Sequence, residues 1–268
     1  MRRKDRAADG RFLAEGPQAV REALGAPDCV ESLLVSVSSL DRHPELMATA
    51  HRAGVPVRTA ADRVLASLTD TSSPQGVVAV CRMIDRPLAD ALGTRPALVV
   101  CCARVRDPGN AGTVIRCADA FGADAVILSE GSVDAYNSKT VRSSAGSLFH
   151  VPLVLGVALR EVVAAASANG LQVLAADGRG LVDLDEMSTS GALARPSLWL
   201  FGNEAWGLRA DDAALADQSI RVPIYGAAES LNLAAAAAVC LYATSTAQRK
   251  GTAGPAPQTH SPAEPVRS

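Results

Sequence analysis

Uninterrupted apolar runs, each followed by a polar turn and a helix-like segment, recur through the second half of the chain. Residues 97–102 are one such run, and residues 197–201 are apolar after Ser197. A strand without polar alternation is typical of a parallel sheet whose two faces are both covered. Between them, residues 113–121 repeat apolar side chains at helical spacing. This half of the chain therefore predicts a mostly parallel sheet with helices on both faces, an α/β fold.

The remaining elements of this half, residues 97–250, follow the same pattern. Further strands are expected at residues 125–128, 151–154, 171–176 and 219–223, and further helices at 159–169 and 231–248. Gly170 follows the first of these helices directly, as glycine often does at helix ends.

Residues 10–82 predict a separate and smaller α/β unit. Strands are expected at residues 32–37, 55–57 and 76–81, and helices at 17–24, 46–53 and 61–67. Two prolines and a glycine within residues 83–96 indicate a linker between the units. Residues 1–9 are expected to form a basic N-terminal tail, and residues 251–268, rich in Pro, Ala, Gly, Thr and Ser, a disordered tail.

Composition limits the kind of partner. The 268 residues are 48% hydrophobic, only 3% aromatic, and carry a formal net charge of −2. A nucleic acid would therefore have to be held by local basic patches, because the whole chain is not basic. The basic N-terminal residues are one candidate patch, and a solvated, mobile terminus is the alternative reading.

Cysteine and histidine usage indicates neither disulfides nor a metal site. The six cysteines form no Cys-x-x-Cys pair and lie mostly in apolar runs, as small core residues do in a reducing compartment. The four histidines are scattered. The charged N-terminus lacks the apolar region of a signal peptide, and no run is convincing as a transmembrane helix, so a cytoplasmic protein is expected.

A first candidate motif spans residues 107–116, where Gly109 and Gly112 flank Asn110 after a strand. Glycine allows tight turns and close approach of a ligand; the alternative is an ordinary loop in which Asn110 caps the helix. Arg116 lies near the positive end of that helix, where a cation gains nothing from the dipole. A phosphate partner explains it better, and a surface salt bridge is the alternative. The spacing does not match a dinucleotide-binding fingerprint.

Two further motifs follow strands in the same way. One comprises Gly202, Asn203 and Glu204, and the other contains Ser230 and Asn232 before an Ala-rich helix. Each has a structural alternative: Glu204 would cap a turn, Ser230 would cap the helix, and Asn232 would be solvated. The alanines suit a tightly packed C-terminus or a dimer face.

A fourth, weaker candidate is Arg142. Three serines follow it closely, at Ser143, Ser144 and Ser147, and a basic residue beside hydroxyl groups suggests an anion-binding loop.

The first three motifs, taken in order, resemble those of the SpoU (TrmH-type) branch of the SPOUT RNA methyltransferases. Residues 11–20 and 73–77 also resemble the N-terminal RNA-binding domain of that family, which is similar to ribosomal protein L30e. The resemblance implies a C-terminal SPOUT fold with a deep trefoil knot, a rare exception to the rule against knots. It also implies a homodimer in which the partner subunit completes each active site.

The function implied is methyl transfer from S-adenosylmethionine to a ribose 2′-hydroxyl in RNA. The N-terminal domain favours 23S ribosomal RNA over tRNA, because simpler tRNA members lack it. The alternatives are a tRNA 2′-O-methyltransferase and a non-catalytic RNA-binding or ribosome-assembly protein with the same fold.

The resemblance also implies site residues. The catalytic set is Arg116, Asn110, Glu204, Asn232, Ser230 and Arg142, and the cofactor-binding set is Leu200, Gly202, Val222, Ile224, Ser230 and Leu231. Arg116 is expected to orient phosphate and hydroxyl, since a guanidinium almost never loses its proton. Trp206 departs from the family pattern, in which small or charged residues are commoner; it either lines the RNA entrance or simply packs.

Overall fold

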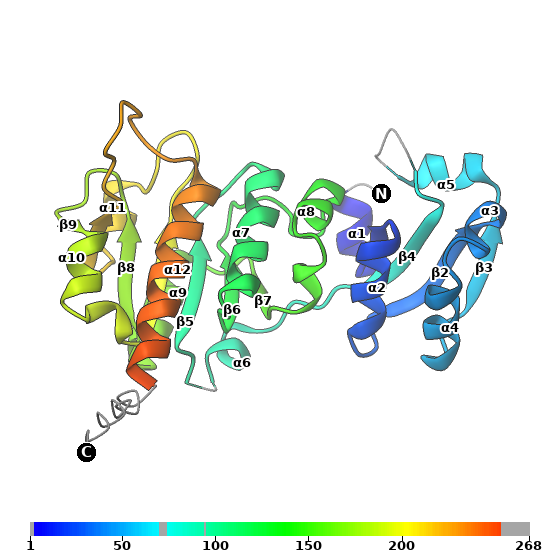
Figure 1. Ribbon diagram of the computed structural model, residues 1–268, viewed down its shortest axis with the longest axis horizontal. Helices are drawn as coiled ribbons and strands as arrows, with labels where there is room; N and C mark the ends of the chain where they lie inside the picture. Colours follow the sequence, from blue (N-terminus) through cyan, green and yellow to red (C-terminus); the bar gives the residue numbers. More distant parts are fainter. Residues whose placement is uncertain (1–2, 70–73, 94, 253–268) are drawn as a thin grey trace, which may run out of the picture.

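The computed structural model describes residues 3–69, 74–93 and 95–252, which form two α/β units lying side by side (Figure 1). The N-terminal unit has a mixed four-stranded sheet of order β1-β4-β2-β3, in which β1 and β2 run antiparallel to β4 and β3 runs parallel to β2. Its strands are β1 (Arg11–Glu15), β2 (Val30–Ser36), β3 (Val57–Ala60) and β4 (Val77–Arg82), and its helices are α1 (Arg3–Asp9), α2 (Pro17–Gly25), α3 (Val37–Leu40), α4 (Pro44–Arg52) and α5 (Asp62–Leu68).

The C-terminal unit has a seven-stranded sheet of order β7-β6-β5-β10-β8-β11-β9, in which every pairing is parallel. The strands are β5 (Leu98–Cys102), β6 (Ala125–Leu128), β7 (Leu153–Leu155), β8 (Gln172–Ala176), β9 (Val182–Asp183), β10 (Ser197–Phe201) and β11 (Gln218–Arg221). The helices are α6 (Leu88–Leu92), α7 (Pro108–Ala120), α8 (Ser138–Ser143), η1 (Ser147–Phe149), α9 (Leu159–Ala168), α10 (Leu184–Thr189), η2 (Ala192–Ala194), α11 (Ala210–Ala213) and α12 (Leu233–Thr252).

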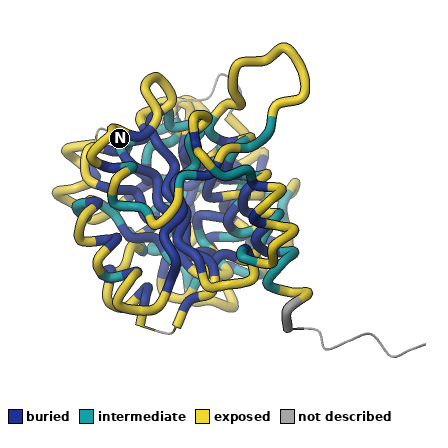
Figure 2. Tube along the Cα trace, turned by 90° about the vertical axis from the view of Figure 1, so that its left-hand side faces the viewer, coloured by how far each residue is buried: buried dark blue, intermediate teal, exposed yellow. Residues whose placement is uncertain are grey.

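Successive residues of the central strands point into two separate hydrophobic cores, one on each face of the sheet. This is why the strand sequences are almost entirely apolar. In β10, Trp199 and Phe201 pack with α7 and α12 on one face, while Leu198 and Leu200 pack with α6 and α9 on the other. The indole N–H of Trp199 donates to Thr244 at 2.9 Å and ties α12 to the sheet. The strands accordingly form a buried centre beneath exposed connections (Figure 2). The predicted parallel α/β sheet is confirmed.

Helix α7 begins earlier than the apolar periodicity predicts, at Pro108 instead of residue 113. Asp107 caps it by accepting the backbone N–H of Asn110 at 2.8 Å, and proline suits the first helical turn. The prediction that Asn110 lies in a turn before the helix, and its alternative as the cap, are therefore both wrong. Gly112 lies within the helix, where a Cβ would overlap the Ser143 hydroxyl, so glycine lets α8 approach closely.

Three segments expected to lack regular structure contain helices. Helix α6 lies within the expected linker and packs Leu88 and Leu92 into the core. Helix α1 lies within the expected basic tail, and α8 replaces the anion-binding loop expected around Arg142. The expected disordered tail overlaps the end of α12, and residues 253–268 lie outside the described part of the chain.

Two of the hydroxyl groups beside Arg142 already donate to backbone carbonyls. Ser143 donates to Lys139 at 2.8 Å, and Ser144 is buried and donates to Val141 at 2.8 Å.

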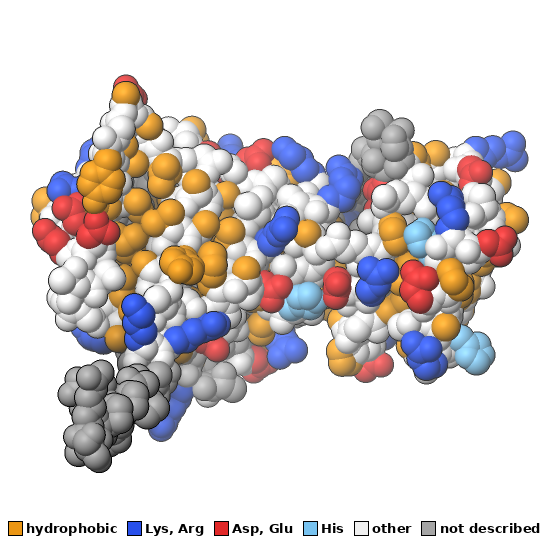
Figure 3. Space-filling view, in the orientation of Figure 1, with side chains coloured by type: hydrophobic (Ala, Val, Ile, Leu, Met, Phe, Trp, Pro, Cys, Tyr) orange, Lys and Arg blue, Asp and Glu red, His pale blue; other side chains and the backbone are white. Residues whose placement is uncertain are grey.

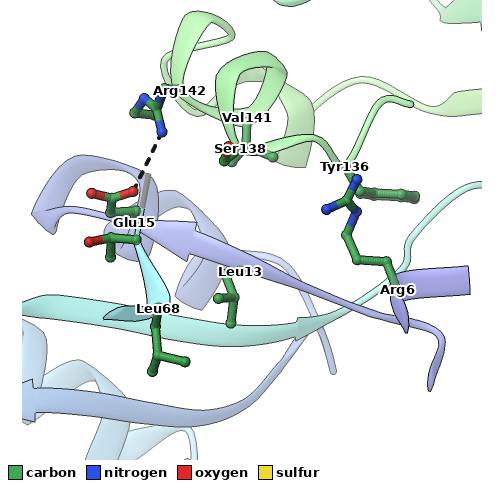
Figure 4. Close-up of a pocket in the computed structure, with 9 residues that line it drawn as sticks. Arg6, Leu13, Glu15, Leu68, Tyr136, Ser138, Val141 and Arg142 are labelled. Atoms are coloured by element: carbon green, nitrogen blue, oxygen red, sulfur yellow. Dashed lines mark ion pairs between the residues drawn. The ribbon is translucent and has the colours of Figure 1, made fainter. Parts of the chain in front are cut away.

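The two units are joined by side chains that meet across a seam. Arg6 of α1, 6% exposed, donates through Nε to Asp134 at 2.9 Å, so it belongs to the seam and not to a mobile basic patch. Arg142 pairs with Glu15 of β1 at 3.5 Å (Figure 4). The ring of Phe12 lies 4.6 Å from that of Tyr136. The seam leaves a hollow of about 20 Å³, far too small for a nucleotide.

All six cysteines are free thiols and five are buried, which confirms that they are core residues. Within the described ranges, no three histidine, cysteine or acidic side chains gather closely enough to hold a metal ion. No helix in that part of the chain is long and apolar enough to span a membrane. The deep trefoil knot stays a prediction, because strand order does not define how a chain threads its own loops.

Candidate active site

A cleft of about 540 Å³ opens at the carboxyl ends of β8, β10 and β11. This is the edge at which parallel α/β sheets bind ligands. The structure brings eight of the eleven predicted site residues to this cleft: Asn110, Gly202, Glu204, Val222, Ile224, Ser230, Leu231 and Asn232. The three motifs, far apart in sequence, therefore form one site.

The second motif folds back on itself directly above β10. Backbone bonds of 3.0 Å and 2.8 Å link Asn203 and Gly207 in both directions, and Gly207 has a φ of 68°. A Cβ on Gly202 would overlap the backbone of Gly207 and Leu208, so only glycine fits beneath the turn. Buried Asn203 fixes the turn by donating to the carbonyl of Arg104 at 2.8 Å and accepting the Ala205 N–H at 2.9 Å.

Glu204 connects the second motif to the first. Its carboxylate accepts the backbone N–H groups of Arg106 and Asp107, each at 3.2 Å, and the side-chain amide of Asn110 at 3.3 Å. It therefore holds the loop before α7 and does not cap its own turn. This contact fixes the position of Asn110 relative to the cleft.

Asp107 and Lys139 lie beside this loop. Lys139 donates to Asp107 at 3.1 Å, while Asp107 caps α7. The backbone N–H of Asn110, followed by Lys139, holds the pKa of Asp107 below its usual range despite partial desolvation.

In the third motif, Asn232 caps α12. The structural alternative from sequence was the reverse, with Ser230 as the cap and Asn232 solvated. The Asn232 side chain accepts the Ala235 N–H at 2.7 Å, and its carbonyl accepts the Ala236 N–H at 2.9 Å. The exposed Ser230 hydroxyl makes no hydrogen bond to any other described residue. It is therefore available to a ligand.

Three predicted residues lie outside the cleft. Leu200 is fully buried beneath the sheet, so its side chain cannot touch a ligand. Arg142 belongs to the seam. Arg116 is exposed on α7, and none of the described residues forms a hydrogen bond or ion pair with it.

Sequence reasoning missed the loop after β8, whose Asp177, Gly178 and Arg179 line the cleft. The signal was present, because Asp-Gly-Arg-Gly follows an apolar strand at residues 177–180, as the other motifs follow theirs. Asn203 belongs to the second motif, but its sequence position alone does not predict that its side chain fixes the turn.

The cleft fits S-adenosylmethionine in size and chemistry. Its volume lies within the range of small-molecule sites. Ile224 and Leu231 are each 37% exposed and offer apolar surface to an adenosyl group, while Asp177, Glu204 and Glu229 offer carboxylates to its cationic methionyl end.

Comparison with known proteins agrees with this geometry. The model of the SpoU rRNA Methylase family matches residues 97–242, which contain all three motifs. The chain belongs to this family. The model for RNA 2′-O ribose methyltransferase substrate binding matches residues 13–87, so the N-terminal unit is the substrate-binding domain of the same family. As a member, the chain is an RNA 2′-O-methyltransferase, and the expected enzyme class is confirmed.

Relatives match along nearly the whole chain. It is 38% identical over 240 residues to the 23S rRNA (guanosine(2553)-2′-O)-methyltransferase RlmP of Bacillus subtilis, covering 90% of both proteins. It is 34% identical over 254 residues to the 23S rRNA (uridine(2479)-2′-O)-methyltransferase of Streptomyces viridochromogenes, covering 90% of this chain and 84% of that one.

A solved structure shares the fold. The SpoU methyltransferase AviRb of Streptomyces viridochromogenes, in complex with AdoMet, superposes with a TM-score of 0.80 at 32% identity, covering 93% of this chain and 95% of that one. The expected SPOUT fold and the expected cofactor, S-adenosylmethionine, are thereby confirmed for the family to which the chain belongs.

Proposed function

We propose that this protein methylates a ribose 2′-hydroxyl of 23S ribosomal RNA. The observation that carries the proposal is the convergence of the three motifs on one cleft in a chain whose relatives, matched over nearly their full length, are named for this reaction. The two relatives modify a guanosine and a uridine, so the nucleotide itself stays open. Since the substrate belongs to the ribosome, we place the enzyme in the cytoplasm.

We propose that the cleft holds the cofactor through the backbone around Gly202, Val222 and Leu231, with Ser230 and Ile224 beside it. Bound S-adenosylmethionine supplies an electrophilic methyl group. The chain contributes position, because an in-line displacement needs the hydroxyl held within contact distance of that carbon.

Arg116 is our candidate for orienting the substrate. An exposed guanidinium that no described residue engages is suited to bidentate contact with an RNA phosphate. We do not assign it the role of base, because a guanidinium almost never loses its proton in proteins. We assign the hydroxyl proton to a phosphate oxygen that Arg116 holds in place.

We also propose a homodimer through α12. Val239 and Tyr242 are 40% and 61% exposed there, and Tyr242 packs edge-on against Phe121 at 5.7 Å. Apolar side chains gather over this helix (Figure 3), around a hollow of about 410 Å³. Phe121 follows α7, the helix of Arg116, so a partner on this surface would lie near that residue.

The dimer is tested by sedimentation of Tyr242→Glu, which should be monomeric and inactive on RNA. Val37→Glu is the matched control, because Val37 is 69% exposed and belongs to α3 of the N-terminal unit. A Tyr242→Glu protein that stays dimeric would rule out this surface.

The substrate is tested by incubating purified protein with radiolabelled S-adenosylmethionine and either rRNA or tRNA. Label in rRNA alone supports the proposal. Label in tRNA alone would keep the chemistry and overturn the substrate. Cofactor binding without label in either RNA would direct the search to ribosome-assembly intermediates.

A further inference from the structure

Trp206 lies in the exposed turn of the second motif. It is 45% exposed, whereas the other tryptophan, Trp199, is fully buried. The turn is closed by the paired backbone bonds between Asn203 and Gly207, so the indole is carried on a fixed support. Its exposed aromatic surface is therefore open to a ligand.

Arg106 lies over this ring. Its guanidinium carbon is 5.6 Å from the ring centroid, a cation–π arrangement. Arg106 is itself exposed, and no described acidic side chain pairs with it. The pair thus presents a flat aromatic surface and an uncompensated positive charge together.

The pair lies at the rim of the active-site cleft. Trp206 stands between Ala205 and Gly207, which both line the cleft, and Arg106 precedes the loop that leads to Asn110. Glu204 fixes the two sides to each other by accepting the Arg106 backbone N–H at 3.2 Å. The surface is therefore held in a constant position relative to the reacting centre.

We propose that Trp206 and Arg106 form a stacking platform for an unpaired base of the RNA substrate, next to the ribose that is methylated. The inference rests on the proposed function for its RNA ligand. Aromatic rings and guanidinium planes are the surfaces on which proteins stack splayed RNA bases, and the Arg106 charge attracts the adjoining phosphate. Trp206 and Arg106 are positioning residues here, acting on RNA and not on the cofactor.

If Trp206 had only a structural role, its replacement would change other properties than RNA binding. Its loss would then change stability or cofactor binding, because the neighbouring residues line the cofactor cleft. A stacking Trp206 affects the KM for RNA and leaves both of those properties unchanged.

The test compares Trp206→Leu, Trp206→Tyr and Arg106→Met with the full-length wild type. Leucine removes the π surface and tyrosine keeps one, while methionine keeps the apolar stem and the Arg106 backbone N–H that Glu204 needs. For Trp206→Leu we expect a roughly tenfold rise in the KM for rRNA, little change in kcat, and unchanged affinity for S-adenosylmethionine by calorimetry. Trp206→Tyr should recover most of the loss, and Arg106→Met should weaken RNA binding with a smaller salt dependence.

Tryptophan fluorescence gives a readout independent of turnover. Titration with a single-stranded oligouridylate should quench wild-type emission, since a stacked base quenches indole, and should leave the residual Trp199 emission of Trp206→Leu unchanged. Binding of the oligonucleotide without quenching, or a Trp206→Leu enzyme with the wild-type KM, would overturn the platform while leaving methyl transfer intact. If RNA quenches the wild-type fluorescence but the wild-type protein methylates no RNA, the result would support stacking and refute the proposed function.

Discussion

The cleft and the seam both contain polar and charged side chains, but these side chains have different surroundings and different roles. In the cleft, Glu204 and Asn232 are exposed to solvent and held through backbone N–H groups. At the seam, Arg6 is buried and bound to Asp134 from a segment 128 residues away. In the cleft, polar atoms remain exposed to a ligand. At the seam, they form ion pairs that join the two units.

Arg116 and Arg142, both predicted to act on RNA, lie outside the cleft and have different surroundings. Arg142 faces Glu15 across the seam, with a side chain 36% exposed. Arg116 is exposed and unengaged among the described residues. Variants of Arg116 and of the cleft should therefore lose activity, whereas variants of the seam should lose stability.

The largest effect is expected from Arg116→Ala. Turnover should fall about 1000-fold, the usual upper range for losing one preorganised charged donor, while affinity for S-adenosylmethionine stays within about twofold because Arg116 lies outside the cleft. Rates on rRNA and calorimetric cofactor titrations measure the two quantities. Arg160→Ala, an exposed arginine on α9, is the control. Normal turnover in Arg116→Ala would remove its assigned role.

Arg6→Ala should be the most destabilising seam variant. It leaves Asp134 without its charged partner in a site where the Asp134 side chain is 13% exposed, at a cost of about 3 kcal/mol. Urea unfolding measures the loss, and cofactor affinity of the folded protein should not change. Arg3→Ala, on the exposed side of the same helix, should be nearly neutral. Equal stability of the two variants would show that the buried pair contributes little.

Gly202→Ala should weaken cofactor binding, whereas Arg6→Ala should lower stability. The new Cβ overlaps the backbone of the 203–207 turn, and displacing that turn should weaken cofactor binding roughly tenfold or more. Gly25→Ala is the matched control, since Gly25 ends α2 in the N-terminal unit and has open space around its Cβ. If both variants bind the cofactor like the wild type, the turn is not part of the cofactor site.

The smallest effect is expected at His150, which links the units through Asp119 at 2.9 Å and Glu22 at 3.2 Å. These carboxylates, Asp119 first, raise the pKa of His150 above its usual value near 6.5. The protonated form is therefore favoured in the folded state. Its contribution is complete below pH ~6.5 and is lost as pH rises through the raised pKa.

Replacing it by His150→Gln should accordingly cost more stability at about pH 6 than at about pH 9. The difference should be about 0.5 kcal/mol, because solvent screens a side chain that is 44% exposed. Urea unfolding at the two pH values measures it. A cost that is equal at both, or larger at the higher pH, would contradict the assigned charge.

Strands β5 and β10 could be predicted because burial on both faces leaves sequences that are apolar throughout, apart from Ser197 at the start of β10. The cleft could be predicted because glycines and polar residues follow β5, β10 and β11. The start of α7 at Pro108 differs from the predicted start at residue 113, because the apolar period begins only at residue 113, whereas Asp107 and Pro108 are the local signals of the helix start.

The seam could not be predicted in the same way. Nothing local to Arg6 specifies Asp134, and a basic terminus has the same sequence whether it is solvated or buried. Helix α6 was hidden because two prolines and a glycine surround it, and its apolar residues matter only once β7 and α9 are beside it. Loop threading and partner contacts are likewise properties of the assembled chain.

Whether the cleft directs methyl transfer to a ribose oxygen of 23S rRNA is best decided by alkaline hydrolysis of 23S rRNA that this enzyme has labelled from radiolabelled S-adenosylmethionine. We expect the label to survive in a single alkali-resistant dinucleotide, because 2′-O-methylation removes the hydroxyl that attacks the neighbouring phosphate. Label recovered only in alkali-released mononucleotides would place the methyl group on a base and overturn the proposed methylation of ribose.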